Sequence, residues 1–128
     1  MRRMLLALMA LFALTLTACS SAGTATSLSP SDFQALTQES GVVTLDVRTP
    51  AEFASGHLPG AVNLDVESPT FTQGLSQLDP NATYAVYCRS GNRSKTALDQ
   101  MDQAGFSKMQ DLDGGIVAWQ SQGLPVVQ

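Results

Sequence analysis

The residues best suited to chemistry form one short polar run, Cys88-Arg89-Ser90-Gly91-Asn92-Arg93-Ser94. The apolar, β-prone residues 83–87 precede it, and residues 95–104 follow it with apolar side chains at helical spacing. We therefore expect a thiol at the end of a strand, a polar loop, and a helix that begins just beyond the loop. This geometry aims several backbone N–H groups and the positive end of a helix dipole at one point, where they stabilise an anion. We interpret the run as an active-site loop.

Cys88 is the candidate nucleophile, because a thiolate attacks an electrophilic centre far better than a neutral thiol does. Gly91 allows the chain to bend around the sulfur and to bring its own N–H close to it. Donors at Ser90, Asn92 and Ser94, from backbone or side chain, can hold the same anion. This interpretation requires the sulfur of Cys88 to be kept negative and exposed to solvent.

The two arginines of the loop are expected to act on the substrate in different ways. Arg93 is assigned to bind it, because a planar guanidinium can hold two oxygens of one anion at once. Arg89 is assigned to attract the anion at the rim of the site.

Alternating strand and helix signals must position this loop. Strands are expected at 42–47, 61–64, 83–87 and 108–112, and helices after 29, after 49, within 65–81, at 95–104 and from 116. Alternation of this kind predicts a parallel α/β sheet that is covered on both faces, with reactive groups at the carboxyl ends of its strands. Asp46, Arg48 and Cys88 lie at such ends, so we expect them to be neighbours. Pairing of Asp46 with Arg48 is favoured over contact of either residue with substrate.

The N-terminal residues carry the marks of export. Two arginines in a basic start are followed by an apolar run, residues 4–16, which is too short to span a bilayer as a helix. We expect a signal peptide at 1–18. The run ends in Leu16-Thr17-Ala18-Cys19, which resembles the lipobox of bacterial lipoproteins and implies a lipid on Cys19. The alternative is an ordinary signal peptide with an incidental cysteine.

This interpretation divides the chain into three parts. A lipid-bearing cysteine and a flexible tether occupy 19–27, and one folded domain occupies 28–128. The expected location is the cell envelope, with the domain anchored to a bacterial membrane and facing the periplasm or the exterior. With Cys19 lipidated, Cys88 has no partner for a disulfide within the chain.

The composition excludes several classes of protein. The chain has 128 residues, 44% of them hydrophobic, which suits one globular domain. Its formal net charge of −4 argues against nucleic acid as a partner. One histidine and one free thiol cannot build a zinc site, so neither a metal nor another cofactor is expected. The histidine, His57, is interpreted as a structural turn residue.

Four blocks of the chain resemble the signature blocks of the rhodanese family. They are Asp46–Phe53, Gly56–Ala61, the loop Cys88–Ser94, and Asp113-Gly114-Gly115 with Trp119. The resemblance implies one domain with a five-stranded parallel sheet and helices on both faces. It also implies thiosulfate sulfurtransferase activity, in which Cys88 takes the outer sulfur of thiosulfate or a similar donor as a persulfide. A thiophilic acceptor, cyanide or a thiol, then removes that sulfur.

Three alternatives remain beside this assignment. Cysteine phosphatases also place an anion between a strand and a helix, but their loop has one residue more than the four between Cys88 and Arg93. A rhodanese-like module without activity would only bind a partner. A persulfide carrier or redox relay for a protein partner would share the loop chemistry and differ in its acceptor.

Overall fold

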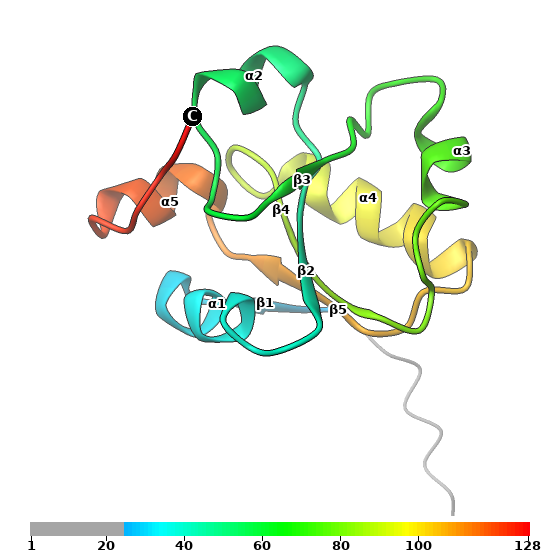
Figure 1. Cartoon of the computed structure of the whole chain (residues 1–128), viewed down its shortest axis with the longest axis horizontal. Helices are drawn as coiled ribbons and strands as arrows, with labels where there is room; N and C mark the ends of the chain where they lie inside the picture. Colours follow the sequence, from blue (N-terminus) through cyan, green and yellow to red (C-terminus); the bar gives the residue numbers. More distant parts are fainter. Residues whose placement is uncertain (1–24) are drawn as a thin grey trace, which may run out of the picture.

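The computed structural model of the chain describes residues 25–128, in which five parallel strands form one sheet. The predicted signal peptide and Cys19 lie outside the described residues. The strand order is β1-β5-β4-β2-β3 (Figure 1). The strands are β1 Thr26–Leu28, β2 Val42–Asp46, β3 Val62–Asn63, β4 Thr83–Tyr87 and β5 Met109–Leu112. The expected five-stranded parallel sheet is therefore confirmed.

The centre of the sheet is built from the apolar runs that predicted buried strands. β4 lies between β5 and β2, and Asp46 at the end of β2 is in register with Tyr87 at the end of β4. Parallel strands buried on both faces need side chains that suit an apolar environment on both sides, as these two runs provide. The shared register brings the carboxyl ends of β2 and β4 to the same edge.

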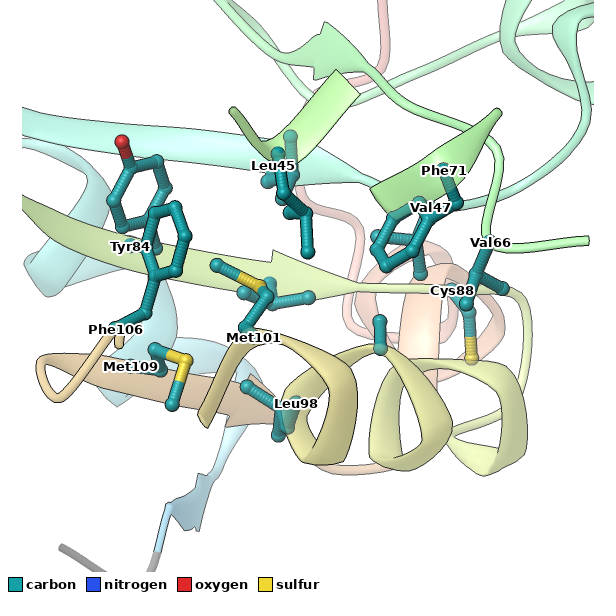
Figure 2. Packing of buried hydrophobic residues seen from close by; sticks show 13 residues of the cluster. Leu45, Val47, Val66, Phe71, Tyr84, Cys88, Leu98, Met101, Phe106 and Met109 are labelled. Atoms are coloured by element: carbon teal, nitrogen blue, oxygen red, sulfur yellow. The ribbon is translucent and has the colours of Figure 1, made fainter. Parts of the chain in front are cut away.

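Helices cover both faces of the sheet. α3 (Phe71–Leu75) and α4 (Asn92–Gln103) lie on one side, and α1 (Pro30–Thr37) and α5 (Gly115–Ser121) lie on the other (Figure 1). Successive side chains of a strand point to opposite faces. Accordingly, Tyr84, Val86 and Cys88 join the apolar cluster beneath α4, whereas Ala85 and Tyr87 join the cluster beneath α1 and α5 (Figure 2 shows the α4 side).

Local signals in the sequence explain where two of the helices begin. Thr49 caps α2 (Pro50–Ser55) by accepting a hydrogen bond from the N–H of Glu52, while the Glu52 carboxylate accepts one from the N–H of Thr49. This is a reciprocal capping box, and it explains why the helix expected after residue 49 begins at Pro50. Ser29 caps α1 in a similar way, because its Oγ accepts a hydrogen bond from the N–H of Asp32.

Two expectations about the elements were wrong in part. The tether was expected to continue to residue 27, but Thr26 and Ser27 belong to β1, which pairs with β5 at the edge of the sheet. A three-residue edge strand whose one apolar side chain is Leu28 has no apolar pattern, so only its pairing with β5 reveals it. The helix after the loop begins at Asn92 instead of residue 95, because Gly91 with a φ of 105° ends the loop and serves as its N-cap.

Within the described part of the chain, no helix has both the length and the apolar character needed to cross a membrane.

Candidate active site

Cys88 follows the last residue of β4 and lies beside the start of α4. The N–H of Gly91 donates a 3.0 Å hydrogen bond to the Cys88 sulfur. α4 begins at the next residue, Asn92, and continues for 12 residues. The partial positive charge at a helix N-terminus favours a negative charge placed against its first turn. The chain thus surrounds this sulfur with the donors that the loop sequence predicted.

The Cys88 sulfur is covered, which contradicts the expectation of an exposed thiolate. Only 1% of the residue is accessible to solvent. Figure 2 shows Cys88 at the end of the apolar cluster, near Val66 and beside the first turn of α4. The early start of α4 explains the burial, since the loop has only three residues outside the helix to pass over the sulfur. A donor molecule can reach the sulfur only if this cover moves.

The start of α5 holds the loop from the opposite face. The N–H of Ile116 donates to the Cys88 carbonyl at 2.9 Å, and the N–H of Val117 donates to the Arg89 carbonyl at 3.2 Å. A side chain at Gly115 could not fit, because its Cβ would lie 2.3 Å from the Arg89 carbonyl oxygen. The glycine pair after β5 therefore brings α5 against the loop.

Ser94 lies inside the site, beneath the loop. It is fully buried, and its Oγ is 3.5 Å from the Cys88 sulfur. The same hydroxyl donates to the Gly91 carbonyl at 3.1 Å, which ties the first turn of α4 to the loop. Of the expected hydrogen-bonding residues, Ser94 is the one whose side chain contacts the sulfur.

Arg93 contacts two carboxylates. Its two terminal nitrogens donate to the two oxygens of Glu52 at 2.7 and 2.8 Å, and one of them also donates to Glu67 at 3.2 Å. Hydrogen bonds from Arg93 lower the pKa of Glu52 to about 2, and those from Glu52 raise the pKa of Arg93. In this structure, both terminal nitrogens of the predicted oxyanion-binding fork are engaged by protein carboxylates. Arg93 thereby joins α4 to α2 and to the segment after β3.

Asp46 and Arg48 form a buried pair, as the sequence favoured. Arg48 Nη2 lies 2.6 Å from Asp46 Oδ2, and the Arg48 backbone N–H also donates to Asp46 at 2.9 Å. The Tyr87 hydroxyl donates to the same carboxylate at 2.5 Å, and Arg48 further donates to the Gly56 carbonyl. Burial opposes the charge on Arg48, but the Asp46 carboxylate outweighs it and raises the pKa of Arg48. The pair braces the turn that follows α2.

The remaining residues of the loop point outward. Arg89, Ser90 and Asn92 are exposed. A pocket of about 240 Å³ opens between α2 and α5, lined by Arg48, Glu52, Ser55, Gly56, Arg89, Ile116, Val117 and Gln120. Arg89 forms no ion pair with the described residues, so its charge is available to an anion at the pocket.

His57 has a structural setting. Its backbone exchanges two hydrogen bonds with Val127, and its ring stacks on Phe53 with the ring centroids 3.7 Å apart. The described residues contain no group of three or more acidic, cysteine or histidine side chains that could hold a metal ion.

Two contributions to the site were missed from the sequence. Glu52 was not expected in the site, yet its carboxylate both caps α2 and binds Arg93. Glu67 was assigned no role, although it also contacts Arg93. Nothing in the local sequence signals these contacts, because they join residues that are 41 and 26 positions apart.

Comparison with known proteins agrees with this geometry. An uncharacterised protein of Synechocystis, slr1261, is 38% identical over 109 residues, which are 85% of this chain; the chain spans only 60% of the length of that relative. A protein of Allochromatium vinosum named sulfurtransferase is 37% identical over 73% of this chain and 86% of its own. A solved structure of a rhodanese-related protein from Thermoplasma volcanium superimposes with a TM-score of 0.71 and 30% identity, covering 80% of this chain and 97% of that chain.

A family model settles the assignment that the loop suggested. The model described as the rhodanese-like domain matches residues 29–122, which include every strand except β1 and all five helices. The thiol between a central strand and a helix N-terminus, the double glycine against the loop, and strands β2 to β5 all lie within the matched range. The chain belongs to the rhodanese family.

Proposed function

We propose that this protein is a sulfurtransferase that moves a sulfane sulfur from thiosulfate, or a similar donor, to a thiophilic acceptor. The Cys88 thiolate attacks the outer sulfur of the donor, a new S–S bond forms, and the S–S bond of thiosulfate breaks. Sulfite leaves with the bonding pair, and Cys88 holds a persulfide. Cyanide or a thiol then removes the terminal sulfur, which returns the thiolate.

The observation that carries the proposal is the hydrogen bond from Gly91 to the Cys88 sulfur at the N-terminus of α4. A thiolate and a persulfide terminus are both anions, so one set of donors stabilises both. The short loop suits a single sulfur atom better than a phosphoryl group, which argues against a phosphatase. The Allochromatium relative, by name a sulfurtransferase, supports the same class.

Arg89, Ser90 and Asn92 are the proposed contacts for the donor's oxygens, because they are exposed on the loop. Arg89 faces the pocket between α2 and α5 and can attract a sulfonate-like group there. Arg93 is proposed to bind substrate only when the donor displaces Glu52 from its fork; otherwise it secures the loop. Asp46 and Arg48 support the site through their mutual pair.

Intact mass after incubation with thiosulfate tests the chemistry without assuming an acceptor. The full chain, free of reductant, is expected to gain one sulfur atom, and peptide mapping should place it on Cys88. Cys88→Ser should gain none, and it should release no thiocyanate when cyanide is added. Lys108→Ala, an exposed change outside the loop, serves as a folded comparison and should gain the sulfur as the native chain does. Absence of the adduct from the native chain would refute the assignment.

A second candidate is a binding module that does not catalyse a reaction. Two observations favour it: Cys88 is buried, and the Arg93 guanidinium is already paired with the carboxylates of Glu52 and Glu67. The same experiment separates the two. A native chain that gains no sulfur while Cys88 remains reduced supports the binding module.

We also propose that the chain is exported and anchored through a lipid on Cys19. The support is the order of basic start, apolar run and lipobox-like residues at the N-terminus. Labelled palmitate should be incorporated into the chain expressed in a bacterium and recovered in the membrane fraction. Cys19→Ala should lose the label, and Cys88→Ala should keep it.

A further inference from the structure

We propose that Asp111 accepts the Cys88 proton through Ser94, so that the thiol and the carboxyl share one proton and one negative charge. Asp111 acts on the sulfur through Ser94 and is therefore a positioning residue. The inference rests on the proposed function in one respect only, namely that Cys88 reacts as a thiolate. It concerns the step that precedes any attack on a sulfur donor.

The proton of Cys88 needs an acceptor inside the protein, because the site is covered. Cys88 is 1% exposed and Ser94 is fully buried. The Ser94 hydroxyl oxygen, 3.5 Å away, is the side-chain atom that can accept a hydrogen bond from the thiol. A serine hydroxyl can accept this proton only if its own proton can move to a second base nearby.

The backbone places Asp111 where such a base is needed. Asp111 of β5 is in register with Val86 of β4, so both side chains point to the face covered by α4. Cys88 lies two residues beyond Val86 and belongs to the same apolar cluster on that face. Strand spacing and rise put the Cα atoms of Asp111 and Cys88 about 8 Å apart. One serine can bridge two side chains at that separation.

The Asp111 carboxyl is buried, and one of its oxygens has no partner. Only 2% of the residue is exposed. Oδ2 accepts a 3.1 Å hydrogen bond from Ser27, whereas Oδ1 has no hydrogen-bond partner among the described residues. Burial raises the pKa of Asp111, while the Ser94 and Ser27 hydroxyls and the charge of Lys95 act in the opposite direction. A buried acceptor beside Ser94 with a raised pKa is suited to take a proton.

The transfer balances in atoms and charge. The S–H bond of Cys88 breaks and its proton binds Ser94 Oγ, while the original hydroxyl proton of Ser94 moves to Oδ1 of Asp111. The hydroxyl hydrogen must first turn from the Gly91 carbonyl, which it faces in this structure. A neutral thiol and a carboxylate become a thiolate and a neutral carboxylic acid. Among the elements packed against Asp111, α4 supplies one charged group that acts on it: the charge of Lys95 lowers the pKa of Asp111.

Two acids that share a charge titrate as a pair, and this provides the test. The rate at which iodoacetamide alkylates Cys88 in the full chain is measured at a series of pH values. Mass spectrometry quantifies the peptide that carries alkylated Cys88, so that alkylation of Cys19 does not contribute to the rate. The native chain should show two steps, the first as the pair loses one proton and the second as it loses the other. Asp111→Asn should show one step. Asp102→Asn, which changes an exposed carboxylate on α4, should keep both.

A single step in the native chain, or two unchanged steps in Asp111→Asn, overturns the proposal. If Asp111→Asn does not fold, the reciprocal measurement decides: the carbon-13 carboxyl signal of Asp111 should titrate in two steps in the native chain and in one step in Cys88→Ala. An identical Asp111 titration in both proteins also overturns it. Failure of sulfur loading beside a two-step profile would refute the proposed function and leave this inference standing.

Discussion

The N–H of Gly91 lies 3.0 Å from the sulfur of Cys88, and Gly91 holds a φ of 105° at this point. A side chain there has room, since its nearest neighbour would be the Gly114 nitrogen at 3.8 Å, but the conformation itself is strained for an L residue. Gly91→Ala should therefore turn the N–H away from the sulfur. We expect a loss of about 1 kcal/mol in the free energy of unfolding and roughly tenfold slower sulfur loading from thiosulfate, as expected for one lost hydrogen bond to an anion.

Gly105 provides the matched control at the other end of α4. Its φ of 93° is similar, and a Cβ would meet no atom within 4 Å. Gly105→Ala should cost a similar free energy of unfolding, by urea titration, without slowing sulfur loading. Equal slowing in both variants would mean that general strain, and not the Gly91 hydrogen bond, controls the reaction.

Substitutions of Arg89 and of Arg93 should have different effects on sulfur loading and on stability. Arg89 is exposed beside the pocket and forms no ion pair with the described residues. Arg89→Ala should raise the thiosulfate concentration needed for half-maximal loading several-fold and weaken its dependence on salt, because screened attraction is lost. The unfolding free energy should change by less than about 0.5 kcal/mol.

Arg93→Lys removes the two-pronged contact with Glu52, since an ammonium group cannot bind both oxygens in the same geometry. We expect it to reduce the unfolding free energy by about 1 kcal/mol and to slow loading far more than the exposed-site change Lys108→Ala. Comparable losses for these two variants would show that the loop has been misinterpreted.

The Glu52 pair should produce a defined dependence of stability on pH. Hydrogen bonds from Arg93 lower the pKa of Glu52 from 4.5 to about 2 in the folded chain. A carboxyl with a lowered folded pKa stabilises the fold above its unfolded pKa, and the contribution disappears as pH falls through the folded value. Near neutral pH, the free energy of unfolding of the native chain should be about 1 kcal/mol higher than that of Glu52→Gln. This difference should disappear as the pH falls from 4.5 to about 2.

Chemical unfolding at a series of pH values measures this difference. Glu39→Gln is the control, because Glu39 is exposed and forms no ion pair with the described residues. A difference between the native chain and Glu52→Gln that stays constant down to pH 2 would show that the ion pair contributes nothing.

The buried pair of Asp46 and Arg48 should matter for stability more than for chemistry. Arg48→Met leaves the Asp46 carboxylate, which is fully buried, without its main partner. Removal of one member of a buried pair costs about 3–5 kcal/mol. Urea unfolding should show this loss, whereas Tyr87→Phe, which deletes only the hydroxyl that donates to Asp46, should cost about 1–2 kcal/mol. A smaller cost for Arg48→Met than for Tyr87→Phe would contradict the bracing role.

Most of the strands and helices, and the place of Cys88 among them, could be predicted from local patterns of side chains. The apolar runs of β2 and β4 and the start of α2 after Thr49 each depend on a few neighbouring residues, so the order of side chains was sufficient to predict them. The edge strand β1 and the first residue of α4 were not predicted. The same local chemistry placed Cys88 between a strand and a helix N-terminus. These features depend on backbone periodicity and hydrogen bonding to near neighbours, which a sequence states directly.

The surroundings of Cys88 could be recognised only in the folded chain. The pairing of Arg93 with Glu52, the position of Asp111 on the α4 face and the burial of Cys88 all depend on contacts between distant segments. Such contacts follow from the order and register of the strands. The local sequence around a charged residue is compatible with many different partners and does not specify one. For this reason the loop could be identified from its residues, whereas the partners that hold its charges became visible only once the sheet had brought them together.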